Sequence, residues 1–247
     1  MKPSLRLGVL ALNMRYFGLL SALLMAAPTS ARSQVTVVDE GSFTISRSGA
    51  RIGRETFTIR RTPGPGGDVY VANATVEFDE ERLSPALRAD ESYSPLAYQL
   101  EVRSGNQVRE RLRAIIGRGR ISAQVKTPKG ESTKEYIVSA GALVLDDNVF
   151  HQYYFLARRS QKLPASGGSV PVVIPQRNAQ QVMRVTTGGN DALTVGGQRL
   201  DARQIVLTEP GGSGGATRHI WVDSAGRVLK VSLDARGVVA VRDEPPR

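Results

Sequence analysis

The side chains best suited to chemistry in this chain are its two histidines, His151 and His219. Asp147 precedes His151 by four residues, so on a helix the two would share one face and could bind a metal ion together. One carboxylate and one imidazole do not complete a site, because zinc centres in proteins use three or four protein ligands. The alternative interpretation is that Asp147 caps a helix and His151 is partly exposed. We therefore predict no metal site and no bound cofactor.

Hydrolytic chemistry also lacks a recognisable arrangement. The sequence contains no G-x-S-x-G motif, which would mark a serine nucleophile at a strand-to-helix turn. Adjacent acids occur at Asp79–Glu81, Asp90–Glu91 and Asp146–Asp147, but a glycosidase pair must face each other across the substrate. The absence of cysteine excludes a thiol nucleophile, thiolate metal ligands and disulfides. We predict no catalytic residues, with an unrecognised hydrolase as the alternative.

Two glycines four residues apart, Gly49 and Gly53, lie among arginines in SRSGARIGRETFTI (46–59). A phosphate-binding loop must lead into a helix, whose N-terminus supplies free amides and a favourable dipole. The residues after Gly53 instead alternate, with Phe57 and Ile59 on one face, which indicates a strand. We therefore predict that both glycines serve a short hairpin loop in which positive φ is needed.

These side chains would be positioned mainly by strands, because the dominant hydrophobic period is two. In VYVANATVEF (69–78), apolar residues fall on one face and mostly polar residues on the other. Such alternation favours antiparallel sheets, and closely spaced turn sequences favour a meander. We predict strands near residues 42–48, 54–62, 68–79, 88–93, 97–104, 107–116, 120–127, 133–138, 180–187, 192–195, 199–208, 217–223, 227–233 and 238–242.

One stretch, LDDNVFHQYYFLARR (145–159), has apolar residues at spacings of three and four, which predicts a helix. Asp146 or Asp147 could cap its start, and Arg158 and Arg159 suit the dipole at its end. The segments at 160–171 and 209–216 are predicted to be loops, and the glycine-rich second one is predicted to be mobile. The predicted fold class is mainly β, an antiparallel half-barrel or closed β-barrel with one packed α-helix.

Aromatic side chains on and near this helix are candidates for a ligand site, because the mouths of β-barrels often bind ligands. Trp221, the only tryptophan, shares a strand face with His219 and Asp223 and either packs in the core or lines a cavity. We predict that the ligand-binding residues are Phe150, Tyr153, Tyr154 and Trp221.

The first residues have the features of a secretory signal peptide. Three basic residues precede an apolar run at 16–27, and small residues at Thr29 and Ala31 suit a cleavage site. The alternative is an uncleaved membrane anchor, and Met14 could replace Met1 as the true start. We predict a signal peptide over 1–31, a single antiparallel β-barrel-like domain over 32–247, and a periplasmic or secreted location after cleavage near Ala31.

The formal net charge is +10, and the leader contributes three of the positive charges. Export argues against nucleic acid as the partner, which leaves anionic lipid head groups, acidic glycans or ordinary solubility as explanations. Arg109, Arg111 and Arg113 alternate along VRERLRAII (108–116) and form a positive stripe on one sheet face. This stripe is either a solvated outer face or a peripheral contact with an anionic membrane or an acidic partner.

The order of four segments carries a resemblance: FTISRSGARIGRETFTI, YSPLAYQLEVRSGN, LDDNVFHQYYFLARR and TRHIWVDSAGRVLKVSL. It resembles exported bacterial families of domains of unknown function, which are similar to the LolA- and LolB-like half-barrels that carry lipoproteins between bacterial membranes. The resemblance covers most of residues 40–242. It implies an incomplete antiparallel barrel that wraps a helix and leaves an apolar cavity for acyl chains.

Together these observations lead to three functional hypotheses. The first is an exported, non-catalytic binding or carrier protein for an apolar or amphipathic ligand of the envelope, such as a lipid or lipoprotein. The second is a structural or assembly factor that binds a protein partner through its sheet surface or edge. The third is the unrecognised hydrolase. A solvent-open cavity lined by side chains of mixed size would favour the first hypothesis.

Overall fold

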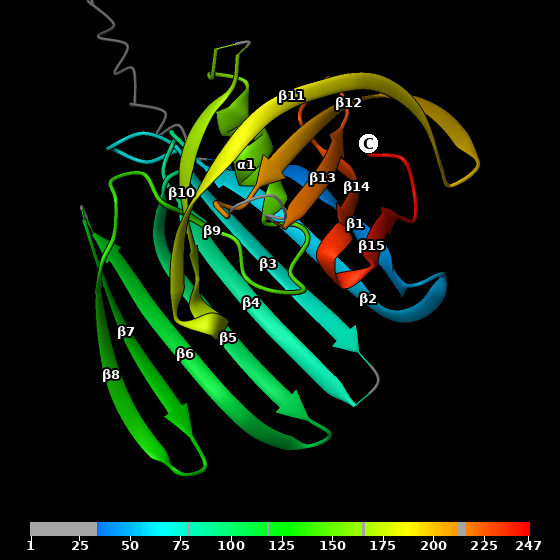
Figure 1. Ribbon diagram of the computed structural model, residues 1–247. Helices are drawn as coiled ribbons and strands as arrows, with labels where there is room; N and C mark the ends of the chain where they lie inside the picture. The colour runs from blue at the N-terminus through cyan, green and yellow to red at the C-terminus, as the bar shows by residue number, and fades with distance from the viewer. Residues whose placement is uncertain (1–33, 79, 118, 165, 212–215) are drawn as a thin grey trace, which may run out of the picture. The chain divides into compact units, whose positions relative to one another are not determined.

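The alternating segments form strands over most of the chain (Figure 1). A computed structural model describes residues 34–78, 80–117, 119–164, 166–211 and 216–247. The predicted signal peptide at 1–31 and residues 212–215 of the predicted mobile loop lie outside them. The strands are β1 (Thr36–Arg47), β2 (Ala50–Thr62), β3 (Val69–Phe78), β4 (Glu81–Ala89), β5 (Pro95–Ser104), β6 (Gln107–Gly117), β7 (Arg120–Thr127), β8 (Gly130–Ile137), β9 (Leu143–Val144), β10 (Gly168–Ile174), β11 (Ala179–Val195), β12 (Gln198–Thr208), β13 (Thr217–Val222), β14 (Val228–Leu233) and β15 (Val238–Arg242).

All of these strands belong to one sheet, in the order β8-β7-β6-β5-β4-β3-β2-β1-β15-β14-β13-β12-β11-β10-β9. Consecutive strands pair as an antiparallel meander on each side of a central seam, where β1 pairs with β15. The short strand β9 is the exception, because it pairs in parallel with β10. Hydrogen bonds do not close the sheet, since β8 and β9 remain its two edges. The predicted antiparallel, mainly β fold class is therefore confirmed, in its open form.

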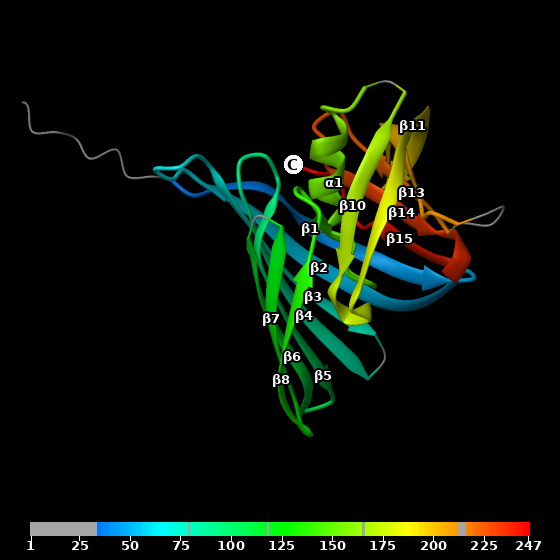
Figure 2. The ribbon, with the colours of Figure 1, turned by 60° about the vertical axis from the view of Figure 1, so that its left-hand side comes forward.

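The sheet curves strongly (Figures 1 and 2). Its buried apolar side chains lie in one cluster. In β3, Tyr70, Ala72 and Val76 are buried, whereas Asn73 and Glu77 are exposed, as the period of two requires. The buried side chains of both halves of the sheet form one continuous apolar core. This core forms because the strands bury their apolar faces in the same enclosed volume.

The helix lies within the curve of the sheet and is shorter than predicted (Figures 1 and 2). It spans α1 (Tyr153–Ser160), and Gln152 is its N-cap residue without a side-chain capping bond. The predicted helix over 145–159 is therefore confirmed only from Tyr153 onward, and its aspartate cap is wrong. Asn148 has a φ of 59°, which interrupts a helix. Arg158 and Arg159 do lie in the last turn, as predicted. In the described part of the chain, no helix combines the length and the hydropathy required to span a bilayer.

Several predicted boundaries are wrong for identifiable reasons. The segment predicted as a strand at 88–93 is mostly a turn, in which Asp90 Oδ1 accepts hydrogen bonds from the backbone amides of Ser92 and Ser94. The strand beside it is β4, whose interior Pro85 conceals the alternation because proline is rare inside strands. The predicted loop at 160–171 overlaps β10, and the two strands predicted at 180–187 and 192–195 form one strand, β11, with a register shift at Thr187/Asn190.

The glycine prediction is half correct. Ser48 and Gly49 form a two-residue hairpin turn with φ values of 49° and 85°, as a type I′ turn requires. Gly53 instead lies inside β2, next to β3, where a Cβ atom would come within 2.4 Å of the Glu77 carbonyl oxygen. Gly53 therefore permits a close approach of two strands and does not serve a loop.

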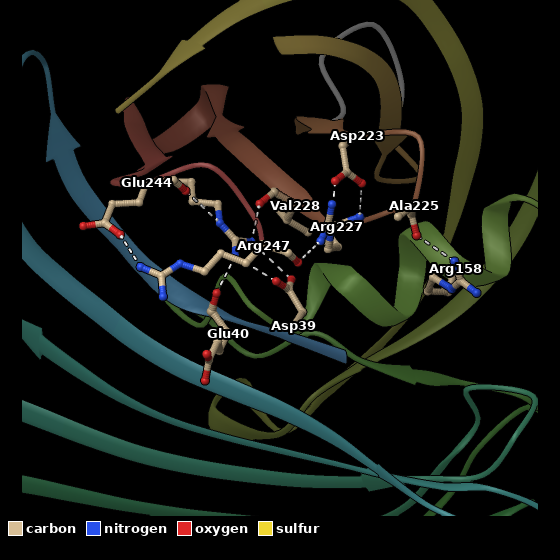
Figure 3. A network of polar contacts seen from close by, with 10 residues as sticks. Asp39, Glu40, Arg158, Asp223, Ala225, Arg227, Val228, Glu244 and Arg247 are labelled. Carbon is tan, nitrogen blue, oxygen red and sulfur yellow. Dashed lines mark hydrogen bonds and ion pairs between the residues drawn. The ribbon is translucent and has the colours of Figure 1, made fainter. Parts of the chain in front are cut away.

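A buried ion pair joins β1 to β15 at the central seam. Arg242 Nη2 lies 2.8 Å from Asp39 Oδ1, and both side chains are almost fully buried. Arg242 also donates hydrogen bonds to the carbonyl oxygens of Glu40, Val228 and Glu244. Burial raises the pKa of Asp39, and Arg242 opposes that effect. Figure 3 shows Glu40, Val228 and Glu244 beside Asp39 at this seam. Asp223 and Arg227 lie on the side of the network toward α1, where Arg158 lies.

We expect Asp39→Asn to lower the free energy of unfolding by about 3–5 kcal/mol, because it leaves a buried guanidinium without a counter-charge. The matched control is Glu135→Gln, which removes the exposed Arg120–Glu135 pair and should cost less than about 1 kcal/mol. Urea denaturation measures both values. Equal effects of the two substitutions would contradict the structural role assigned to the seam.

Candidate functional site

A buried carboxylate on β2 holds the segment that precedes α1. Glu55 is fully buried, and its carboxylate accepts hydrogen bonds from the backbone amides of Phe150 at 2.6 Å and His151 at 2.8 Å. The His151 ring contributes a third contact, with Nδ1 2.6 Å from Glu55 Oε1, and stacks on Phe57. A carboxylate can be buried in this way because each of these hydrogen bonds replaces one that water would otherwise donate to it.

A second buried carboxylate, Asp146, joins the same segment to both walls of the sheet. Its Oδ2 accepts a hydrogen bond from the Tyr98 hydroxyl on β5 at 2.9 Å, and its Oδ1 accepts one from the backbone amide of Gln176 at 3.0 Å. Its own backbone amide donates to Gln152 Oε1. Burial raises the pKa of Asp146 to about 6, against the opposing hydrogen bonds from Gln176 and Tyr98. Burial also raises the pKa of Tyr98.

These acid–base groups face backbone and one another. Glu55 accepts hydrogen bonds from the turn that leads into α1, and Asp146 links that turn to Tyr98 and Gln176, so both carboxyl groups position the turn. The Asp147 and His151 pair does not chelate, since Asp147 binds Arg177 and Arg236 while His151 turns to Glu55. Among the described residues, no group of three or more His, Cys, Asp or Glu is placed to hold a metal ion.

Three of the four predicted ligand-binding residues come together in the core. Phe150, Tyr153 and Tyr154 are 0%, 2% and 4% exposed, respectively. The Tyr153 hydroxyl accepts a hydrogen bond from Arg218, and the Tyr154 ring lies edge-on to the rings of Tyr93 and Phe155. In this closed arrangement the three side chains pack the interior of the sheet around α1.

Trp221 lies apart from them. Adjacent residues on β13 face opposite sides, and Ile220 and Val222 point into the core while Trp221 points outward. It joins a small separate cluster with Val195, Ala202 and Leu229, and its Nε1 donates to Asp191 at 2.6 Å. Lys230 lies over its ring. Asp191 also lines a polar cleft of about 780 Å³ with Asp201 and Asp223. The structure therefore does not place Trp221 with the three residues near α1.

A narrow apolar crevice lies elsewhere on the inner side of the sheet. One wall consists of β5–β8, and the other consists of the edge strands β9 and β10 with Pro175. Its volume is about 10 Å³, about the space needed to hold one water molecule. No charged side chain lines it, and the lining residues are Tyr98, Leu112, Ala114, Ile116, Ile121, Ala123, Tyr136, Val144, Val173 and Pro175.

The crevice adjoins a much larger open cleft. This cleft, which we call the mouth, has a volume of about 740 Å³ and lies at one end of β5–β8. Ile116 lines both the mouth and the crevice. The chain between β8 and β9 covers the mouth through Val138, Ala140 and Ala142, and Pro95 and Leu96 line its opposite side. The crevice and the mouth therefore meet at Ile116.

Arg111 and Arg113 of the predicted arginine stripe lie on the opposite, outer face of this wall. Arg109, Arg111 and Arg113 are exposed, whereas Leu112 and Ala114 on the same strand are buried and line the crevice. A register shift leaves Arg109 unpaired in the β5–β6 ladder. One wall thus presents apolar side chains inward and arginines outward.

Sequence reasoning missed the roles of Glu55, Tyr98 and Asp146. A signal for Glu55 exists, because it falls on the same face as Phe57 and Ile59 in an alternating strand and must therefore be buried. No comparable signal exists for the crevice, because its walls come from strands that are far apart in the sequence.

Comparison with known proteins supports the fold. No family model matches the chain, and no curated protein matches it. It is similar to the crystal structure of a β-barrel-like protein of domain of unknown function DUF1849 from Brucella abortus, with 8% identity and a TM-score of 0.57 over 86% of this chain and 98% of that chain. A DUF1089 family protein from Pseudomonas aeruginosa is 18% identical with a TM-score of 0.40, over 91% of this chain and 95% of that chain.

The raised pKa of Asp146 predicts a specific pH dependence of stability. The folded protein holds a proton on Asp146 up to about pH 6, whereas the unfolded chain loses it near 3.8. Stability from this group is therefore full below pH 4 and is lost as the pH rises through 6. Relative to Asp146→Asn, the wild type should lose about 2.5 kcal/mol of unfolding free energy between pH 4 and 7. Urea denaturation at a series of pH values measures this difference, and parallel curves for the two proteins would contradict it.

Proposed function

We propose that this protein is an exported, non-catalytic binding or carrier protein that takes an apolar chain, such as the acyl part of a lipid or lipoprotein of the envelope, into the crevice. The observation that carries the proposal is the crevice itself, an uncharged slot between β5–β8 and the edge strands β9–β10. Ligand pockets are mostly apolar with few polar groups, and they occur at the mouths of barrels. The sequence resembles LolA- and LolB-like half-barrels, in which an incomplete barrel leaves an apolar cavity for acyl chains.

The closed crevice must widen to admit a chain, and its cover is weakly held. The strand β9 pairs with β10 at two positions only, Val172 with Leu143 and Val173 with Val144. The other edge of β9 has no strand partner in the sheet of described residues. Displacing β9 and the 138–142 connection would break the backbone bonds to β10, the bond from the Val138 amide to the Gly119 carbonyl oxygen and the bond from Arg159 to the Gly141 carbonyl oxygen. It would also join the mouth to the crevice.

The resulting site differs from the ligand site that we predicted from the sequence. In the proposal, the first contacts of an acyl chain are Ile116, Ile121 and Tyr136, which line the crevice. Phe150, Tyr153 and Tyr154 form the packed interior behind the crevice and would become ligand contacts only when a ligand reaches further into the core. Trp221 has no part in this site, because it faces the other side of the sheet.

The second candidate is an assembly factor that binds a protein partner by strand addition. One observation favours it: β8 is an edge strand, and its outer hydrogen-bonding side has no partner strand in the described sheet. An extended peptide could pair there through main-chain bonds. Such binding would be independent of the crevice, so substitutions inside the crevice would leave it unchanged.

Titration with a dansyl-labelled fatty acid tests the crevice. The wild type should bind it saturably with enhanced fluorescence. Ala123→Leu fills part of the buried wall and should weaken binding at least about tenfold, since each methylene displaced is worth about 0.8 kcal/mol. Tyr136→Ala removes one of the proposed first contacts and should weaken binding.

The matched control is Ala192→Leu, the same substitution at an exposed position on β11. It should bind the probe as the wild type does, and circular dichroism should show all three variants folded. Absence of saturable binding by the wild type, or equal affinities of Ala123→Leu and the wild type, would refute the proposal.

A further inference from the structure

The outer face of β5–β8 carries two exposed isoleucines next to the mouth, and a third exposed apolar side chain, Leu96, lines the mouth itself. Ile115 is 73% exposed, Ile137 is 86% exposed and Leu96 is 37% exposed, whereas most large apolar side chains of the described residues are buried. Leu96 itself lines the mouth, and Ile115 and Ile137 directly precede the mouth residues Ile116 and Val138. We call these three residues the apolar tip.

The strand register places the two isoleucines on one face. Ile137 pairs with Arg120, which pairs with Gly117, and Ile115 lies two residues before Gly117 on β6. Directly paired residues share a face of the sheet, and so do residues two apart on a strand. Ile115 and Ile137 therefore point outward together, away from the crevice and beside its mouth.

Positive charge surrounds the apolar tip on the same face. Glu101 binds both Arg103 and Arg111, and Glu135 binds Arg120. Arg109 and Arg113 form no ion pair with any described residue, and both are exposed. The cationic residues of this outer face outnumber its carboxylates; they are Arg103, Arg111, Arg113, Arg120 and Lys126, against Glu101, Glu131 and Glu135.

We propose that this outer face docks the protein on an anionic lipid surface, with Ile115 and Ile137 in the interfacial layer and Arg109 and Arg113 at the lipid phosphates. Apolar side chains bordered by arginines are the combination that holds a peripheral protein at such a surface. The isoleucines are separated by polar residues, which suits a fluid interface better than the packed core of a protein interface.

The docked orientation would place the mouth next to the lipid head groups, because the apolar tip and the mouth share one end of β5–β8. An acyl chain could then pass between the membrane and the crevice with little exposure to water. This consequence rests on the proposed function, whereas docking itself does not. Membrane binding and probe binding can therefore be measured and can fail separately.

Vesicle co-sedimentation tests the docking. Phosphatidylcholine vesicles with 30 mol% phosphatidylglycerol should retain the protein, and pure phosphatidylcholine vesicles should retain much less. Arg109→Gln and Arg113→Gln should each weaken binding roughly fivefold. Raising the salt to about 0.5 M should weaken binding further. Ile115→Ser with Ile137→Ser should reduce binding to the anionic vesicles at both salt concentrations.

Matched controls use exposed residues on other strands. Arg184→Gln with Arg199→Gln removes two charges from β11 and β12, and Val182→Ser removes an exposed apolar side chain from β11. These controls should bind vesicles as the wild type does. Equal loss in the controls, or no preference of the wild type for anionic vesicles, would overturn the docking proposal; the second result would assign the arginines to another partner, such as an acidic protein.

The fatty-acid titration in the absence of vesicles separates the two proposals. Arg109→Gln with Arg113→Gln should bind the dansyl probe with unchanged affinity, because both side chains are exposed and neither lines the crevice. Loss of vesicle binding with intact probe binding supports docking through the outer face. Vesicle binding by a wild type that takes up no probe would refute the apolar-chain site and leave the docking surface supported.

Discussion

The hydrogen bonds from the Phe150 and His151 amides to Glu55 are the interaction on which the interior depends. A curved sheet can enclose an irregular segment only if the segment's backbone amides find partners, since an unpaired buried amide costs about as much as a lost hydrogen bond. Glu55 supplies those partners from β2, and Asp146 supplies the complementary link to Tyr98 on β5 and to Gln176 after β10. The turn before α1 is thereby attached to both halves of the sheet.

This attachment divides the interior into two regions with different properties. Around α1 the aromatic side chains are fully enclosed, and buried polar groups specify their positions. Between β5–β8 and β9–β10, contact is purely apolar and the cover is a two-residue strand. Apolar contacts lack direction, so in the proposed opening this second region would separate at the cost of the β9–β10 backbone bonds and of apolar burial. The open edges of the sheet make such a movement compatible with an intact core.

The wall formed by β5–β8 serves both proposals because a strand presents alternate residues to opposite faces. Leu112 and Ala114 line the crevice, and Arg111 and Arg113 face outward from the same strand. The similarity to a β-barrel-like protein of unknown function supports the fold and leaves the activity to be argued from the site. The apolar lining of the crevice favours an apolar ligand. The exposed isoleucines and arginines of the outer face favour docking on an anionic surface.

The sequence by itself determined the fold class, because period-two alternation and frequent turns specify antiparallel strands wherever they occur. It also determined the outward stripe of arginines. It did not determine where the helix begins, since the backbone of Asn148 and the bonds of Asp146 override the helical spacing of the apolar residues. The separation of Trp221 from Phe150, the burial of Glu55 against a segment nearly a hundred residues away, and the crevice itself were decided by tertiary structure. Each depends on which distant strands the curvature of the sheet brings together, and local periodicity carries no information about that.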